Sequence, residues 1–299
     1  MKTKAFITVF TPAYNRAHTL PRTYESLRKQ EMKNFEWLII DDGSKDNTKE
    51  LVQNWIETEK EFKISYIYKE NGGMHTAYNT AYSNIDTELN ICIDSDDCLA
   101  DNAIKKIYDF WQQVKNKGYA GIIGLDADMS GSIIGDRFPK GLKDTSFSEY
   151  YGSGNHGDKK FVYITEIVKQ FPPYPEYKNE RYVGISCLHL LISQQYRLAV
   201  LDEILCNVEY QRDGHSTTMF SEYLNSPRGF AYYRKIYMTY PRSFKDLIKN
   251  TTHYVAESLI AQNSNYIKES PHKLLTIILT PAGGLLRMYI ERKAKGKKV

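Results

Sequence analysis

The sequence is poor in cysteine, with four in 299 residues. No two cysteines form a C-x-x-C pair, and no histidine stands beside them at metal-ligand spacing. This pattern supports neither a zinc site nor a disulfide framework, and reduced thiols in a cytoplasmic protein are the expectation. The four residues are Cys92, Cys98, Cys187 and Cys206.

Long apolar runs and a strong charge of one sign are also missing. No uninterrupted apolar stretch reaches the roughly 20 residues that span a bilayer, and the N-terminus enters a strand pattern without the features of a signal peptide. The net charge of +4 is too small to indicate nucleic acid as a partner. Basic residues instead gather near the C-terminus, at Arg287, Arg292, Lys293, Lys295, Lys297 and Lys298.

Strand and helix patterns alternate as far as about residue 126. Five apolar segments read as strands, and amphipathic helices separate them. This order predicts an α/β fold with a mostly parallel sheet covered by helices on both faces. Residues 197–211 are predicted to form a hairpin of two strands, and the sequence pattern is helical again from residue 216. The five predicted strands are residues 5–11, 35–42, 63–70, 88–97 and 119–128.

Polar residues follow three of these strands at the point where each ends. Residues 11–14 close the first strand, residues 41–44 the second, and Asp94, Asp96 and Asp97 the fourth. Ligands of open parallel sheets bind beyond the carboxyl ends of the strands. Carboxylates so close together repel one another unless a cation lies among them, and they suit Mg²⁺ or Mn²⁺. The alternative is that one of the acids caps the following helix, but capping does not require three.

Four motifs resemble those of the family 2 glycosyltransferases, which have the GT-A (Rossmann-like) fold. They are "TPAYNR" (11–16), "DDGSKDNT" (41–48), "ENGGMHTAYN" (70–79) and "DSDD" (94–97). A further stretch, "VEYQRDGHS" (208–216), is similar to a segment of bacterial members that build surface polysaccharides. The resemblance implies a catalytic domain over residues 1–215, divided into a nucleotide-sugar half (1–126) and an acceptor half (127–215). A helical extension with a basic tail would follow over residues 216–299.

The resemblance also implies roles for individual residues. Tyr14 would lie against the nucleotide base and Asp42 would accept a hydrogen bond from it, while Asp96 or Asp97 would hold Mn²⁺ or Mg²⁺. Gly72 and Gly73 would let the backbone approach the donor. His75 would face the diphosphate or sugar, or else be a structural histidine. The full set of donor-binding residues implied is Pro12, Tyr14, Asn15, Asp42, Gly72, Gly73, His75 and Asp94.

An inverting transfer needs a carboxylate that deprotonates the acceptor hydroxyl. At the position where relatives carry this base, the sequence has Ile185, which cannot act as one. The candidates are Glu180 first, then Asp213, with Glu176 as a further displaced position. The structural alternatives are a solvated loop acid for Glu180 and a turn at Asp213-Gly214.

The C-terminal stretch 273–299 combines apolar residues with lysines and arginines. Such a segment can lie in the interface of an anionic membrane, or pack as helices on the catalytic domain. Pro281 and Gly283-Gly284 are expected to break it into pieces too short to span. This favours a location in the cytoplasm, peripheral to the inner face of the plasma membrane.

Together these features predict a metal-dependent, inverting glycosyltransferase of the hexosyl type. It would move a sugar from a nucleotide-diphosphate donor, a UDP-sugar first, to a glycan or lipid-linked acceptor of surface polysaccharide. A catalytically silent partner subunit that binds nucleotide-sugar or glycan is the rival, prompted by Ile185. A nucleotidyltransferase ranks last, because residues 11–20 lack a glycine-rich phosphate loop.

Overall fold

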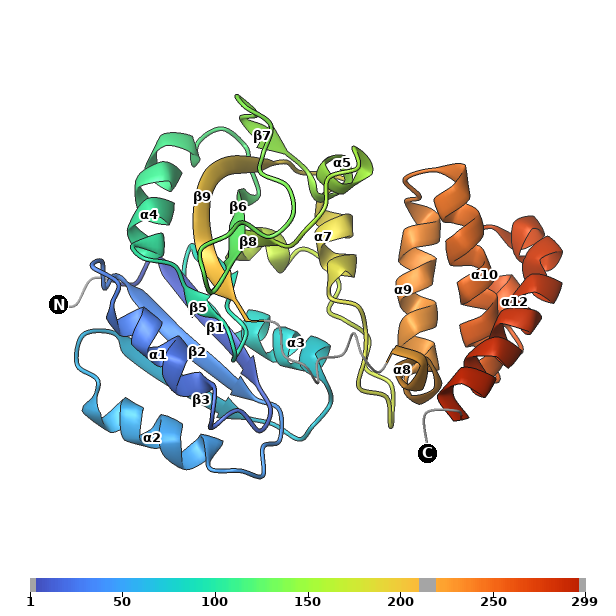
Figure 1. Ribbon diagram of the computed structural model, residues 1–299, viewed down its shortest axis with the longest axis horizontal. Helices are drawn as coiled ribbons and strands as arrows, with labels where there is room; N and C mark the ends of the chain where they lie inside the picture. The colour runs from blue at the N-terminus through green and yellow to red at the C-terminus, as the bar shows by residue number, and fades with distance from the viewer. Residues whose placement is uncertain (1–3, 210–218, 296–299) are drawn as a thin grey trace. The chain divides into compact units, whose positions relative to one another are not determined.

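The computed structural model describes residues 4–209 and 219–295 and separates into two compact units (Figure 1). Unit 1 contains the sheet and unit 2 is helical, and each is described by itself. Unit 1 consists of Met1–Asn71, Ala77–Pro172 and Ile192–Glu209, and unit 2 of Gly72–Thr76, Pro173–Leu191 and Tyr210–Val299.

A nine-stranded sheet organises unit 1, in the order β3-β2-β1-β4-β8-β6-β9-β5, with β7 paired to β9. The first four strands in this order are parallel, and β8 runs antiparallel to both β4 and β6. The α/β sheet covered by helices is therefore confirmed. The strands are β1 (Ile7–Ala13), β2 (Phe35–Asp41), β3 (Lys63–Tyr68), β4 (Leu89–Cys92), β5 (Cys98–Leu99), β6 (Gly121–Asp128), β7 (Asp144–Thr145), β8 (Lys159–Ile164) and β9 (Leu198–Val208).

Alternate side chains of the central strands enter two different layers. Val9 of β1 packs into the main core with helices α1 (Leu20–Arg28), α2 (Thr48–Thr58) and α4 (Ala103–Val114). Phe10 points to the opposite face, where it meets the rings of Tyr78 and Tyr82 on α3 (Met74–Asn84) at 5.0 and 5.5 Å. Burial on both faces explains why these parallel strands read as continuous apolar runs.

The stretch predicted as a hairpin forms one strand instead. β9 runs for 11 residues and curves visibly in Figure 1. Its pairing with β6 shifts register twice, between Ile123 and Leu125 and between Leu125 and Asp126. Bulges of this kind bend a strand without ending it, so Asp202 and Glu203, both exposed, sit on a bend rather than in a turn. The polar region after β6 carries β7, α5 (Phe147–Gly152) and, beyond β8, α6 (Thr165–Val168).

Unit 2 is a group of helices in which α10 packs along α9 on one side and along α12 on the other (Figure 1). A buried ion pair joins α9 to α10, with Arg234 Nε 3.3 Å from Glu257 Oε1. The helices are α7 (Ser186–Ile192), α8 (Met219–Asn225), α9 (Pro227–Thr239), α10 (Phe244–Ile260), α11 (Tyr266–Glu269) and α12 (Lys273–Lys295).

The expected break in the C-terminal stretch is wrong, because α12 is a single helix of 23 residues with Pro281 inside it. Gly283 is buried against α10, and a Cβ at this position would lie 2.4 Å from Val255 Cγ1. The glycine therefore serves close helix packing, which outweighs its low helix propensity. By length and composition Lys273–Ala294 is apolar enough to cross a membrane, a property shared with core helices of soluble proteins.

Candidate active site

Two loops at the carboxyl ends of β1 and β2 are held together by hydrogen bonds. Asn15 adopts a left-handed backbone conformation with φ 54°, which Asn tolerates better than most residues. Its amide N–H donates to Ser44 Oγ at 2.8 Å, and its Oδ1 accepts from the Lys45 amide at 2.8 Å. Asn15 thus fixes the loop that presents Tyr14, whose side chain is 41% exposed. Pro12 precedes them as a buried residue of β1.

The two aspartates that end β2 are both buried, but they have different neighbours. Asp41 accepts hydrogen bonds from the Tyr66 hydroxyl at 2.5 Å and from the Ser44 amide at 2.7 Å. Asp42 forms an ion pair with Lys69, with 2.8 Å between Oδ1 and Nζ. Asp41 therefore shapes the loop, while Asp42, the residue predicted to meet a base, carries a paired charge at the sheet edge.

The three clustered aspartates form a turn directly after β4. Asp94 and Asp96 are half-buried and Asp97 is buried. The Asp97 amide donates to the Asp94 carbonyl at 3.0 Å, and Asp97 Oδ1 accepts from the Glu209 amide at 3.1 Å. The capping alternative is not observed, since α4 begins after Asn102, whose side chain makes no cap hydrogen bond.

Burial and repulsion from neighbouring carboxylates disfavour the charged forms of Asp96 and Asp97. Burial raises the pKa of the Asp97 carboxyl to about 7, with Lys160 opposing the shift and Asp94 adding to it. The pKa of Asp96 is raised too, by burial and then by Asp94. A cation near this turn would relieve the repulsion.

Part of this positive charge comes from a lysine that was not predicted from the sequence. Lys160 on β8 is largely buried, and its Nζ lies 3.7 Å from Asp126 Oδ1 on β6. Burial alone would lower the pKa of Lys160, but the charge of Asp126, joined by Asp97 and Asp94, holds it well above its ordinary value. Only the tertiary pairing of β8 between β4 and β6 brings this lysine to the acids.

A second missed group connects α1 to the acidic turn. Arg22 donates from Nη2 to the Asp96 carbonyl at 2.7 Å and also pairs with the carboxylate of Glu209. Thr23 on the same helix donates to the Asp97 carbonyl at 2.7 Å. Helix α1 and the end of β9 therefore fix the backbone of the turn and leave the Asp94 and Asp96 carboxylates half-exposed. Glu209 is the first residue of "EYQ" in the stretch 208–216, and its place in that motif is the one feature of the sequence that could have identified it.

Within the described ranges 4–209 and 219–295, no group of three or more His, Cys, Asp or Glu side chains is placed to hold a metal ion. Mg²⁺-type sites, however, commonly use only one or two carboxylates and take further oxygens from a substrate diphosphate. The half-exposed Asp94 and Asp96 fit that kind of site. The residues present therefore suit a metal that binds together with a diphosphate.

The remaining predicted residues belong to unit 2. Gly73 has φ +95°, and a Cβ on it would lie 1.9 Å from the Arg181 carbonyl oxygen, so only glycine fits there. Gly72 precedes it, and His75 is buried at 2% exposure on the first turn of α3. Met74 is 37% exposed.

The candidate base Glu180 is buried rather than solvated. Its two carboxylate oxygens accept from Arg228 Nε at 2.8 Å and from the Gly229 amide at 2.9 Å, which fixes its loop to the start of α9. Ile185 accepts a hydrogen bond from the Tyr174 hydroxyl on its carbonyl at 2.7 Å. Glu176 is exposed, and Asp213 lies outside the described residues.

Known structures share this fold. S. aureus TarS (residues 1–349, with UDP-GlcNAc) superposes with a TM-score of 0.59 at 15% identity, over 97% of this chain and 92% of that one. The mannosyltransferase PcManGT from Pyrobaculum calidifontis, solved with GDP-Man and Mn²⁺, gives a TM-score of 0.55 at 15% identity, over 96% of this chain and 88% of that one. These likenesses confirm the fold class that the motifs implied.

Sequence relatives cover less of the chain. Glycosyltransferase GlyG of Streptococcus pneumoniae is 33% identical over 165 residues, 55% of this chain and 49% of GlyG. A Campylobacter jejuni GalNAc(5)-diNAcBac-PP-undecaprenol beta-1,3-glucosyltransferase is 29% identical over 147 residues, 48% of this chain and 46% of that enzyme. The chain thus spans no more than about half the length of these relatives.

The family model of glycosyl transferase family 2 matches residues 8–171. This match begins at the second residue of β1 and extends past β8, and it contains the hydrogen-bonded loops of Asn15 and Ser44 and the acidic turn after β4. It therefore includes the whole sheet edge at which the predicted polar residues of unit 1 gather. Because the match covers more than half of the 299 residues, the chain belongs to glycosyl transferase family 2.

Proposed function

We propose that this chain is a metal-dependent, inverting glycosyltransferase that moves a hexosyl group from a UDP-sugar to a glycan or lipid-linked acceptor in surface-polysaccharide synthesis. The observation that carries the proposal is the acidic turn after β4, with Asp94 and Asp96 half-exposed beside the ends of β1 and β2. Family membership supports the reaction class. The donors named for TarS and PcManGT, and the lipid-linked acceptor named for the C. jejuni enzyme, support the substrate classes.

In this proposal the residues of unit 1 bind and orient the donor. Tyr14, exposed at the loop that Asn15 fixes, lies against the base, and Asp42 accepts a hydrogen bond from it after exchanging its pairing with Lys69. Asp94 and Asp96, with Asp97 as the deeper acid, hold Mn²⁺ or Mg²⁺. When bound, the metal supplies Lewis-acid stabilisation of the departing diphosphate. Gly72, Gly73 and His75 remain donor residues on the resemblance alone.

A turnover assay with a panel of nucleotide-sugars tests the function. With Mn²⁺ and a suitable donor, the chain is expected to release UDP slowly in the absence of acceptor and faster with an undecaprenyl-diphosphate-linked glycan. Calorimetry with UDP and Mn²⁺ gives an independent binding readout. Binding of UDP without turnover on any donor and acceptor would instead establish the rival, a silent partner subunit, which the apolar Ile185 favours.

The catalytic base is proposed to be Asp213 or Glu180, and the two make different predictions. Glu180→Gln weakens the ion pair to Arg228 and should destabilise unit 2 by roughly 1–2 kcal/mol, while Asp213→Asn should lower kcat with little effect on Tm. Thermal unfolding and UDP-release kinetics measured on both variants separate these outcomes. If Glu180→Gln loses kcat at unchanged Tm, then Glu180 is the base and its contacts to Arg228 and Gly229 open during the reaction.

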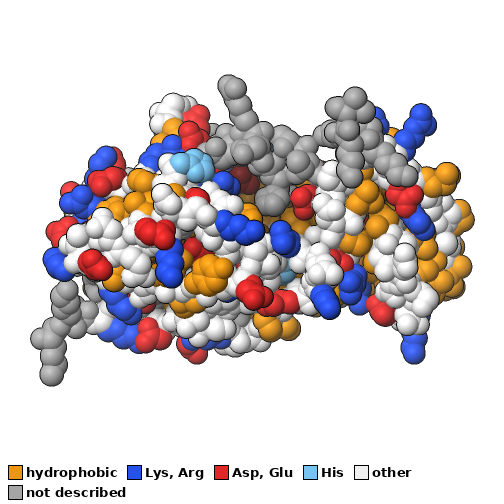
Figure 2. Space-filling model, turned by 90° about the horizontal axis from the view of Figure 1, so that it is seen from below, with side chains coloured by type: hydrophobic (Ala, Val, Ile, Leu, Met, Phe, Trp, Pro, Cys, Tyr) orange, Lys and Arg blue, Asp and Glu red, His pale blue; other side chains and the backbone are white. Residues whose placement is uncertain are grey.

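A peripheral membrane contact is also proposed, through the outward face of α12. Figure 2 shows hydrophobic side chains gathered over the C-terminal helices. Six large apolar residues of this helix are between 49% and 78% exposed, and Arg292 and Lys293 follow them. An apolar stripe with a basic end suits the interface of an anionic bilayer. The stripe consists of Leu274, Ile277, Ile278, Leu285, Met288 and Tyr289.

Substituting the stripe should release the protein from vesicles. We expect Ile278→Glu/Leu285→Glu to weaken binding to phosphatidylglycerol vesicles, measured by co-sedimentation, by roughly 100-fold. Burying each of these two apolar side chains in the bilayer would contribute at least about 1.5 kcal/mol to the binding free energy. Ser264→Glu, which adds a charge at an exposed turn outside the stripe, is the matched control. Equal binding by all three proteins would show that α12 does not contact lipid.

A further inference from the structure

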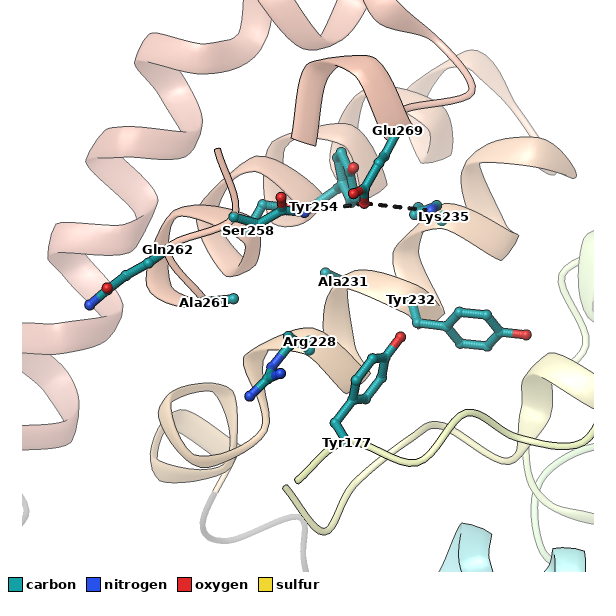
Figure 3. Close-up of a pocket in the computed structure, with 11 residues that line it drawn as sticks. Tyr177, Arg228, Ala231, Tyr232, Lys235, Tyr254, Ser258, Ala261, Gln262 and Glu269 are labelled. Atoms are coloured by element: carbon teal, nitrogen blue, oxygen red, sulfur yellow. Dashed lines mark hydrogen bonds and ion pairs between the residues drawn. The ribbon is translucent and has the colours of Figure 1, made fainter. Parts of the chain in front are cut away.

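Unit 2 contains a pocket of about 580 Å³ that the proposed chemistry does not use (Figure 3). It lies between α9, the second half of α10, the segment 261–269 and the loop that carries Tyr177. All of its lining residues are outside residues 8–171, the part matched by the family model. Two of its lining residues have small side chains, Ala231 on α9 and Ala261 directly after α10, and these leave space for the pocket. Its volume is within the range of small-molecule sites.

Two tyrosines give the pocket flat apolar surfaces. Tyr177 and Tyr232 are both half-buried, and Figure 3 draws the Tyr177 ring between Arg228 and Tyr232. The Arg228 guanidinium carbon lies 5.7 Å from the centre of the Tyr177 ring, which holds that ring in place. Burial raises the pKa of Tyr232 to about 12, so its hydroxyl stays a hydrogen-bond donor. Tyrosine faces attract weakly positive C–H groups, and the hydroxyls bind polar ones.

The charged groups around the pocket are already compensated. Arg228 pairs with Glu180 at 2.8 Å, and Lys235 Nζ lies 3.9 Å from Glu269 Oε2. Glu269 also accepts a hydrogen bond from Asn263 Nδ2 at 3.2 Å. A phosphate or carboxylate ligand would therefore compete with these carboxylates for each cation. A purely apolar ligand would remove water from the same polar groups at a cost.

The tyrosine faces and the compensated charges both favour an uncharged ligand that has many hydroxyl groups and flat C–H faces. We propose that this pocket binds a neutral sugar unit of a glycan chain, at a site distinct from the acidic turn of unit 1. The inference rests on the proposed function, because it places part of the acceptor glycan on unit 2. Tyr177 and Tyr232 contact the faces of the sugar ring, and their hydroxyls bind its hydroxyl groups.

Saturation-transfer NMR on the full chain tests this site with cellotetraose, chitotetraose and mannotetraose, and with tetragalacturonate as an acidic comparator. At least one neutral tetrasaccharide should give a transfer signal that tetragalacturonate does not. Tyr232→Ala should weaken its binding roughly tenfold, the loss expected for one aromatic contact. Ala261→Trp, which fills the pocket from a half-buried position, should abolish binding. Tyr240→Ala, an exposed tyrosine outside the lining, is the control.

UDP binding with Mn²⁺, measured on the same samples, separates this inference from the proposed function and confirms that each variant is folded. Loss of saccharide binding with UDP binding retained supports the pocket. Saccharide binding without any UDP binding would sustain the pocket and remove the proposed function. The inference is overturned if no neutral tetrasaccharide binds, if tetragalacturonate binds equally well, or if both pocket variants bind like the unmodified chain.

Discussion

Replacing Asp96 with Asn is expected to lower Mn²⁺-dependent sugar transfer by roughly 10²–10³-fold, the loss typical of removing one group that stabilises transition-state charge. The Asp96 side chain is half-exposed, and its backbone carbonyl accepts a hydrogen bond from Arg22. The substitution should therefore leave folding intact while it removes a carboxylate from the proposed metal site. UDP release measured over a range of Mn²⁺ concentrations gives the readout.

Asp109→Asn is the matched control for this prediction, because it removes a carboxylate from an exposed pair with Lys105 on α4. It should retain full activity. Calorimetric titration of Mn²⁺ in the presence of UDP should show weaker metal binding for Asp96→Asn alone. Transfer and metal binding that stay unchanged in Asp96→Asn would remove Asp96 from the proposed mechanism and with it the main support for the metal.

The second large effect is expected on stability, from Lys160→Met. This substitution leaves Asp126, which is 2% exposed, without its cation, and it also removes the positive charge that opposes the raised pKa of Asp97. Breaking a buried ion pair by deleting one partner typically costs about 3–5 kcal/mol. Urea unfolding, with the m-value checked for constancy, measures the loss.

A double variant distinguishes the charge from the packing contribution. Lys160→Met/Asp126→Leu removes both charges and should recover most of the lost stability, since apolar replacement of a buried pair is often neutral. In the single variant the pKa of Asp97 should also rise beyond about 7, because Lys160 lowers it in the intact protein. A single variant as stable as the double would show that the Lys160–Asp126 contact carries little energy.

Lys160 and Asp126 are both largely buried, whereas the Asp94 and Asp96 side chains of the acidic turn are half-exposed. The positive charge of Lys160 interacts favourably with Asp126, Asp97 and Asp94 and offsets part of the repulsion among them. This compensation lowers the electrostatic cost of folding the acidic turn, while Asp94 and Asp96 stay half-exposed. In the proposed metal site, such preorganisation would avoid the cost of rearranging charges when a ligand binds.

Much of unit 1 could be predicted from the sequence, because its signals are local. Apolar runs such as those of β1 and β2 and the amphipathic pattern of α4 depend on neighbours within one element. Asp42 and Asp94 could be assigned to one edge of the sheet because the ends of parallel strands meet there, and their roles in donor binding stay predictions. The strand β9 was misread as a hairpin, since its bulges depend on pairing with β6, a partner distant in sequence.

The same distinction holds across the molecule. The sequence alone determined the alternation of strands and helices as far as about residue 126, the family motifs and the acidic stretch after β4, because each is written in a short contiguous stretch. Only the tertiary structure decided that Lys160 faces Asp126, that Glu180 is held by α9, and that α12 continues through Pro281 against α10. These outcomes depend on contacts between distant segments, whose energies outweigh local propensity and leave no local pattern.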